Sequence, residues 1–309
     1  VPSWFSERLP LADDLGREGA AFQGALLDKL RAGGRPLVRD WLREFPVDEN
    51  AVRALARVFD RQVQYAGAES VATDERIVVE AVRDREEYER TFYVHAPYGR
   101  RFNDGLSRLV ARRCATEANA NVRVAVADNG FSVAMPLNRK VDVAGILRDL
   151  DPAGVRAALR EALDGTDLRE RYFRINATRA LMILKRYKGY EKSASEQQVA
   201  SEMLLGFAED LPEFAVVEET YRELIEDKLD LAGIREVLAA VQSGDVTVVS
   251  RTLDSPSPLA FGLATLSASD VVLAEDEAAA LREFHERVTA AIEGEEDGVS
   301  GGRDAGVPD

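Results

Sequence analysis

Apolar residues in this chain follow two different periods, and the change of period constrains the fold more than any other feature. Residues 13–70 and 141–242 carry apolar side chains at helical spacing, with an expected break at the glycines 33–34. Between them, 76–84 and 90–97 resemble two strands, a helix is expected over 101–118, and two strands flank an Asp-Asn-Gly turn at 128–130. A later strand at 245–253 is expected to return to this sheet. The chain is therefore predicted to be α+β, with a small sheet between helical segments.

The same periods divide the chain into six expected parts. Residues 1–12 form a proline-containing linker, 13–70 a helical module, and 71–140 the sheet module that strand 245–253 completes. Residues 141–243 form a second helical module, 244–292 the returning strand and a helix at 275–292, and 293–309 an acidic tail without fixed structure.

The chain of 309 residues has a net charge of −15, which by itself disfavours binding to nucleic acid. Two features weaken that exclusion: the acidic residues are spread along the chain, as suits a salt-rich cytoplasm, and the basic residues are clustered. No stretch is long and apolar enough for a membrane span, and no signal peptide is recognisable. We therefore expect a cytoplasmic protein without membrane contact.

Motifs for common catalytic chemistries are missing from the sequence. There is no G-x-x-x-x-G-K-[ST] loop for nucleotide phosphates, no G-x-S-x-G elbow, and only two histidines and one cysteine. A structural zinc site and a histidine-based triad are therefore not expected. Cys114 is expected to be a buried, inert thiol in a helix. We assign no catalytic residue, cofactor or metal to this chain.

The segment VHAPYGRRFN (94–103) ends a strand, turns at Pro-Tyr-Gly and opens a helix with Arg100 and Arg101. Free N–H groups at a helix start favour anions, whereas positive side chains there are slightly unfavourable for the helix itself. Arg100 and Arg101 are therefore candidates for contacts to backbone phosphates. Solvated arginines near Asp104 explain the same pattern equally well.

A local excess of positive charge marks residues 168–192, which hold eight Lys and Arg against two Glu. Tyrosines are interleaved with them, as in grooves that follow phosphates and stack bases. We expect a helix that ends at Gly189, and an amphipathic helix whose arginines pair with acidic neighbours would explain the same composition. The candidate nucleic-acid contacts in this segment are Arg174, Arg179, Lys185, Arg186 and Lys188.

Trp4 lies in the proline-flanked entry segment, near Arg8. An exposed tryptophan in such a loop can stack on a base of a single strand, with an effect of ~1–3 kcal/mol. Trp4 and Arg8 are therefore candidate nucleic-acid contacts. A tryptophan that fixes the linker to the following domain is the alternative, and Trp41 is expected in the core.

Two acidic stretches have structural explanations that we prefer. Glu196-Gln197-Gln198 would form a capping box with Ser193 or Ser195 at the start of a helix. An acidic helix with a structural Tyr221 would present a solvated face made of Glu218, Glu219, Glu223, Glu226 and Asp227.

These segments occur in an order that resembles a known family. The resemblance is to the DEAD/H-associated domain of Lhr-type superfamily-two helicases, and it covers about residues 1–265. It is carried by WFSERLPLADDLGRE (4–18), RIVVEAVRD (76–84), VHAPYGRRFN (94–103), RINATRALMILKR (174–186), VVEETYRELIEDKLDLAGIREVL (216–238) and SPSPLAFGL (255–263).

The resemblance implies a C-terminal module of an ATP-dependent DNA helicase, from a halophilic archaeon, that guides single-stranded DNA during translocation and unwinding. It implies helix–turn–helix-like modules around a small mixed, barrel-like sheet. Its partners would be single-stranded or forked DNA and the upstream RecA-like and winged-helix domains of the same polypeptide. ATP and Mg would bind in those motor domains, because this chain lacks their motifs.

Three other functions stay open on the sequence. A DNA glycosylase-like module would use a carboxylate such as Glu196 to activate water beside a flipped base. A protein-interaction module would dock through the acidic tail. Part of a helicase that acts on RNA would show the same motifs.

Overall fold

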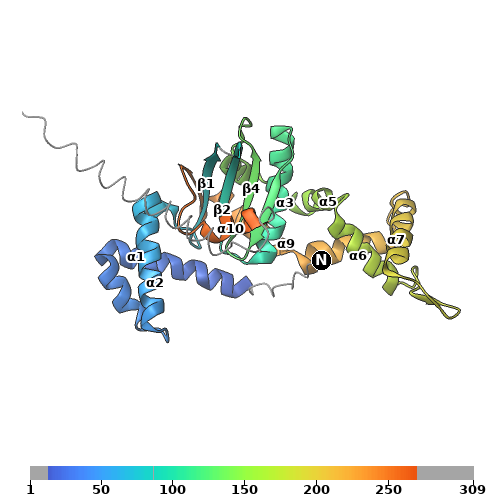
Figure 1. Ribbon diagram of the computed structural model, residues 1–309, viewed down its shortest axis with the longest axis horizontal. Helices are drawn as coiled ribbons and strands as arrows, with labels where there is room; N and C mark the ends of the chain where they lie inside the picture. Colours follow the sequence, from blue (N-terminus) through green and yellow to red (C-terminus); the bar gives the residue numbers. More distant parts are fainter. Residues whose placement is uncertain (1–12, 86, 270–309) are drawn as a thin grey trace, which may run out of the picture. The chain divides into compact units, whose positions relative to one another are not determined.

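The computed structural model describes residues 13–85 and 87–269, which fall into two compact units (Figure 1). The first unit combines residues up to 149 with residues from 240 onward, and the second consists of residues 150–239. The expected linker, the helix at 275–292 and the acidic tail lie outside the described residues. Trp4 and Arg8 also lie outside them.

Two helices begin the first unit. α1 (Asp13–Leu42) is interrupted at Gly33 and Gly34, whose backbone angles are not helical, so the expected break is confirmed. α2 (Glu49–Ala66) starts after Asp48, whose carboxylate caps its first turn. Trp41 is partly buried at the margin of the core between these helices, which includes Leu26, Leu27, Val38, Val52 and Phe59.

A five-stranded sheet lies at the centre of the first unit. Its strands follow the order β3-β4-β2-β1-β7, and all neighbours are antiparallel except β7, which runs parallel to β1. The expected return of the late strand to the sheet is therefore confirmed. The strands are β1 (Arg76–Asp84), β2 (Glu89–His95), β3 (Arg123–Ala127), β4 (Gly130–Pro136) and β7 (Thr247–Leu253).

The expectation of a barrel-like sheet is wrong. Among the described strands, β3 and β7 form opposite edges and do not pair with each other, so the sheet is mixed but open. A barrel requires every strand to have two neighbours, whereas here helices cover the sheet instead. α3 (Arg100–Ala118) and α10 (Phe261–Ser269) both pack against β3 and β4, and α4 (Val143–Asp149) packs against β7.

Side chains along β1 and β2 alternate between the two faces of the sheet. Val82 and Tyr93 lie on the face that packs against Ala260 and Leu263, at the start of α10. The opposite face carries the residues at odd positions of β1 and even positions of β2, among them Phe92. This alternation separates two environments within one pair of strands.

The second unit is helical apart from one short hairpin, β5 (Arg186–Tyr187) and β6 (Tyr190–Glu191). The last residues of α9 belong to the first unit. The helices are α5 (Val155–Leu163), α6 (Asp167–Arg179), α7 (Ala194–Glu209), α8 (Ala215–Arg222), the π-helix η2 (Glu223–Lys228) and α9 (Leu231–Ser243). The helix–turn–helix-like character of these modules stays a prediction.

The helix expected to continue through the basic segment to Gly189 is a wrong prediction. α6 ends at Arg179, and Leu181 has a φ of 60°, which a right-handed helix cannot continue. Lys188 (φ 48°) and Gly189 (φ 85°) form the turn between β5 and β6. Two-residue hairpin turns of this kind need positive φ at both central positions, so Gly189 closes a hairpin and does not end a helix.

Candidate nucleic-acid interface

The first two candidate arginines lie at the start of α3, in the first unit. Gly99 precedes them with a φ of 91°, and the first turn of α3 contains no acidic residue. Arg100 is exposed and Arg101 is half-buried. The guanidinium of Arg100 is therefore accessible to a phosphate beside the positive end of this helix.

Buried side chains of the same motif hold the turn before α3. The Asn103 amide donates hydrogen bonds to the carbonyl oxygens of Ala96 (2.8 Å) and Asp128 (2.9 Å). Tyr98 is buried, and its ring centre lies 4.8 Å from that of Phe102. These residues have a structural role, which is to fix the position from which the arginines extend.

The remaining candidate cations gather at the end of α6 and on the β5–β6 hairpin, in the second unit. Lys185, Arg186 and Lys188 are exposed, and Arg174 is half-buried on α6. The arginines of α3 belong to the other unit. The predicted contacts among the described residues therefore belong to two units, and each group is a candidate in its own right.

Carboxylates pair with some of the basic residues. Arg179 pairs with Glu223 at 3.1 Å, and Arg186 pairs with Glu191 across the hairpin at 2.8 Å. Both arginine side chains are exposed, so these pairs contribute little to stability and can be exchanged for contacts with phosphate. Pairing with acidic neighbours thus explains part of the local composition.

Exposed apolar side chains accompany these cations. Leu181, just after α6, is 75% exposed, and Tyr190 on the hairpin is 57% exposed. The Tyr190 hydroxyl donates a hydrogen bond to the Glu196 carboxylate at 2.6 Å, which raises the pKa of Tyr190. An accessible aromatic ring among cations is the arrangement that stacks on the bases of a single strand.

Glu196 caps α7, so its carboxylate already has hydrogen-bond partners. Its backbone N–H donates to the Ser193 hydroxyl, and its carboxylate accepts the Ser193 N–H at 2.8 Å, so the expected capping box is confirmed. The hydrogen bond from Tyr190, followed by those from Ser193, lowers the pKa of Glu196. A carboxylate with a lowered pKa is a weaker base, which argues against a role in activating water.

The acidic residues of α8 and η2 are exposed apart from the half-buried Glu223, which confirms the expected solvated face. The Arg160 guanidinium donates two hydrogen bonds to Glu218, at 2.7 and 2.9 Å, and lies 3.9 Å from the centre of the Tyr221 ring. The Tyr221 hydroxyl donates to Asp164 at 2.7 Å. These contacts connect α5, α8 and the loop before α6.

One apolar stripe was not anticipated from the sequence. Val199, Met203 and Phe207 follow each other at intervals of four on α7 and are all exposed. Their period is that of a core-facing helix, so the sequence alone cannot distinguish this exposed face from a buried one. Exposed apolar patches are typical of surfaces that contact other proteins.

A buried polar cluster in the first unit was also missed. Glu80 is fully buried on β1 and accepts hydrogen bonds from the Ser257 hydroxyl (2.6 Å) and backbone N–H (3.2 Å). One of its oxygens lies 3.0 Å from Nε2 of His95, without hydrogen-bond alignment, and forms an ion pair when the imidazole is protonated. The buried Gln62 amide donates to the Ser70 hydroxyl at 2.9 Å beside it. A carboxylate flanked by the apolar residues 77–79 and 81–82 of this strand was the available sign.

The ionisation of Glu80 predicts how stability depends on pH. Burial alone would raise its pKa, but His95 and the hydrogen bonds from Ser257 outweigh burial and hold the pKa below the ordinary value of 4.5. Stabilisation by the ionised carboxylate is therefore present above pH 4.5 and is lost as pH falls through the lowered pKa. We expect the stability difference between the natural chain and Glu80→Gln to shrink between about pH 6 and about pH 3.

Urea unfolding of both chains across that range measures this difference. A difference that stays constant or grows on acidification would contradict the assignment. His95 and Tyr93 lie near the Glu80 carboxylate, and both are present in both chains.

Reactive groups are scarce in the described part of the chain. Burial, followed by the charge of Glu117, raises the pKa of Cys114 to about 12, so the expectation of a buried, inert thiol is confirmed.

In residues 13–85 and 87–269 no three His, Cys, Asp or Glu side chains are grouped to hold a metal. The sequence also lacks a phosphate loop, so its residues do not fit ATP and Mg. Among the described helices, none has the length and hydropathy needed to cross a membrane.

Comparison with known proteins gives a family match and similar sequences. Residues 71–260 match the family described as DEAD/H associated. ATP-dependent helicase Lhr-Core protein 2 of Thermococcus barophilus is 35% identical over 294 residues, covering 94% of this chain and 33% of its own length. ATP-dependent helicase Lhr-Core of Methanothermobacter thermautotrophicus is 36% identical over 299 residues, covering 94% of this chain and 34% of its own length.

A solved structure has the same fold. The Mycobacterium smegmatis helicase Lhr, in a structure bound to ssDNA and AMP-PNP, matches with a TM-score of 0.72 and 25% sequence identity. The match covers 85% of this chain and 32% of that protein. The chain therefore spans about a third of the length of the curated relatives it matches.

Proposed function

The chain belongs to the DEAD/H-associated family, and from that premise we propose that it is the C-terminal, nucleic-acid-binding module of an ATP-dependent DNA helicase. Similarity to Lhr-Core helicases over 94% of this chain supports the proposal, as does similarity to a helicase structure bound to ssDNA. In this proposal the RecA-like motor and winged helix belong to the same polypeptide, and ATP and Mg bind there.

The observation that carries the proposal is the exposed basic hairpin. Within a chain of net charge −15, residues 185–192 hold four cations and one carboxylate. Three of these cations are exposed beside the accessible Tyr190 ring. Phosphates would contact the cations while a base stacks on the tyrosine, which is how single strands are held without regard to sequence.

The first test is the binding of fluorescent single-stranded DNA across a salt series. The variant to compare carries Lys185→Ala, Arg186→Ala and Lys188→Ala. We expect weaker binding and a slope of log K against log salt concentration that is smaller by about 2, because each phosphate contact on a single strand contributes roughly 0.7. Arg179→Ala is expected to have a smaller effect, because it removes one candidate contact instead of three.

A charge-matched control separates a site from a general change of charge. Arg43, Arg156 and Arg222 each pair with carboxylates elsewhere, so their triple alanine variant removes the same charge from positions with no proposed contact. Equal salt slopes for both triple variants would refute the hairpin as the site. Trp4→Ala tests the remaining stacking candidate, with an expected loss of about 1–3 kcal/mol of binding free energy.

Protein docking is the second candidate function, favoured by the exposed apolar stripe Val199, Met203 and Phe207 on α7. It predicts no salt-dependent affinity for DNA, so the same titration distinguishes protein docking from DNA binding.

A glycosylase-like function predicts that the chain generates abasic sites in damaged DNA without ATP, whereas the proposed module releases DNA unchanged.

A further inference from the structure

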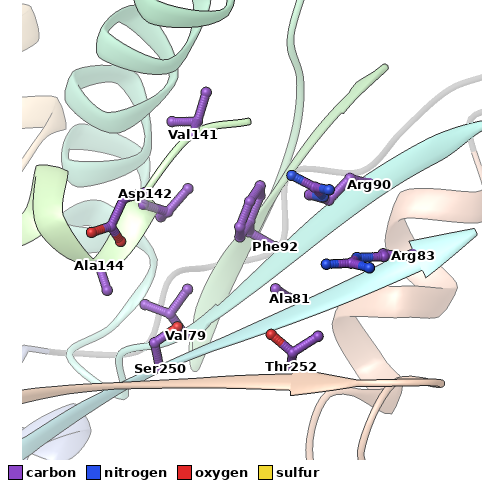
Figure 2. Close-up of a pocket in the computed structure, with 11 residues that line it drawn as sticks. Val79, Ala81, Arg83, Arg90, Phe92, Val141, Asp142, Ala144, Ser250 and Thr252 are labelled. Carbon is purple, nitrogen blue, oxygen red and sulfur yellow. The ribbon is translucent and has the colours of Figure 1, made fainter. Parts of the chain in front are cut away.

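A pocket opens on one face of the five-stranded sheet, on the side away from Tyr93 (Figure 2). Its volume is about 200 Å³, and its walls come from β1, β2, β7 and the residues that lead into α4. Phe92 lies at its centre, with Val79 and Val141 among the apolar walls. Ser250 and Thr252, both exposed on β7, add hydroxyl groups.

Two arginines form the remaining side of this pocket. Arg83 and Arg90 are direct partners across the antiparallel β1–β2 pair, and Figure 2 shows both guanidinium groups on the same side of the pocket, beside Phe92. Like charges opposite each other destabilise a pair of strands. Within residues 13–85 and 87–269 neither arginine has a carboxylate partner, and Arg90 donates to the Arg139 carbonyl oxygen at 2.9 Å. Desolvation, followed by the charge of Arg83, lowers the pKa of Arg90.

The carboxylates next to the two arginines along β1 and β2 belong to the other face of the sheet. Asp84 and Glu89 are the next partners in the register, so their side chains alternate to the side of Tyr93, whose pKa both help to raise. Asp142 lines the pocket, but its carboxylate accepts the N–H of Gly145 at 2.9 Å and thereby caps α4. At this end of β1 and β2, the positive side chains therefore lie on one face of the sheet and the negative ones on the other.

We infer that this pocket is a second contact for the nucleic-acid strand, in which Arg83 and Arg90 hold one phosphate group. Two guanidinium groups that have no carboxylate partner among the described residues provide the donors that suit phosphate oxygens. The hydroxyls of Ser250 and Thr252 offer further donors, and Phe92 provides an apolar floor for the attached sugar. The inference rests on the proposed function, because the bound phosphate is part of the strand that the chain is proposed to bind.

The size of the pocket favours one phosphate group over a larger ligand. Sites for drug-sized molecules and cofactors have volumes of roughly 300–1,000 Å³, and this pocket is smaller. It therefore suits a phosphate with its sugar, presented either within a strand or by a free mononucleotide. The arginines were not singled out in the sequence because they lie seven positions apart on either side of a turn, and only the strand register brings them together.

The test compares two pocket variants of the full chain. The Arg83→Ala, Arg90→Ala double variant removes the cations, whereas Thr252→Asp keeps both arginines and offers them a competing carboxylate. We expect each to weaken binding of an oligothymidylate roughly tenfold at low salt and to reduce the salt slope by roughly 0.7, the contribution of one phosphate contact on a single strand. The Arg43→Ala, Arg222→Ala double variant is the control of equal charge, and circular dichroism checks that every variant is folded.

Titration with inorganic phosphate and with thymidine monophosphate identifies the source of the phosphate. The Nε–Hε signals of the labelled arginines report binding directly, and oligonucleotide should displace both small ligands. Unchanged oligonucleotide binding in both pocket variants, with loss in the hairpin variant, would overturn this inference and leave the proposed function standing. Phosphate binding at Arg83 and Arg90 in a chain that binds no oligonucleotide would overturn both.

Discussion

Replacing Glu80 with alanine is expected to lower the free energy of unfolding of the first unit by about 3–5 kcal/mol, because it removes one member of a buried charged contact and leaves the others unpaired. The Ser257 hydroxyl and N–H lose their acceptor, and His95 loses the carboxylate 3.0 Å away. The measurement is urea unfolding followed by tryptophan fluorescence. A Trp4→Phe background leaves Trp41, in the first unit, as the sole reporter.

Three further variants locate the origin of that loss. Glu80→Gln keeps the shape and an acceptor but not the charge, so we expect an intermediate effect. Ser257→Ala removes one hydrogen bond, for which about 1 kcal/mol is typical. Glu75 is exposed just before the same strand, and Glu75→Ala should change stability by less than about 0.5 kcal/mol. If Glu80→Ala were as mild as this control, the buried cluster would not be a determinant of stability.

Replacing Gly130 with alanine is expected to destabilise the first unit by about 2–6 kcal/mol, from backbone strain together with a steric clash. Gly130 has a φ of 152°, and a Cβ there would lie 2.1 Å from the carbonyl oxygen of Val94. Gly130 pairs with His95 where β4 begins, so the clash acts on the β2–β4 pairing itself. The same urea experiment measures the effect.

Gly67 provides the matched control for this substitution. It lies in the same unit with a φ of 85°, and a Cβ there would meet no atom within 4 Å. Gly67→Ala therefore introduces backbone strain alone, for which about 1–3 kcal/mol is expected. Equal losses for the two variants would show that the strands accommodate the extra methyl group and would contradict the predicted clash.

The spacing of apolar residues predicted most helices and strands, but it did not predict whether the sheet is open or closed. Strands 76–84 and 245–253 were recognisable from β-branched residues, and the turn at 128–130 from its Asn-Gly pair. The edges of a sheet depend on contacts between distant segments, which a period cannot report, so the resemblance suggested a barrel where the sheet is open. α10 was not anticipated because residues 261–269 carry apolar and small side chains without helical alternation.

The candidate interface shows the same division between local and distant information. The excess of cations in 168–192 is a property of composition, and the structure places its last part on an exposed hairpin. The carboxylate partners of Arg160 and Arg179 come from α8 and η2, more than 40 positions away. Which cations are paired, and which face of β1 each residue occupies, could therefore be learned only from the fold.

The insertion of one unit within the other has a consequence for biosynthesis. Residues 150–239 form a continuous stretch, so the second unit can assemble its contacts as soon as that stretch leaves the ribosome. The first unit cannot assemble so early, because β1 pairs with β7, which is synthesised much later. Glu80 likewise accepts a hydrogen bond from Ser257, which follows it by 177 residues. Closing so long a loop slows folding. Until β7 has been synthesised, the edge of β1 is unpaired and the Glu80 carboxylate lacks the Ser257 hydrogen bonds that it has in the folded chain. The unit that begins later in the sequence is therefore the first that can be completed, and the central sheet is the last.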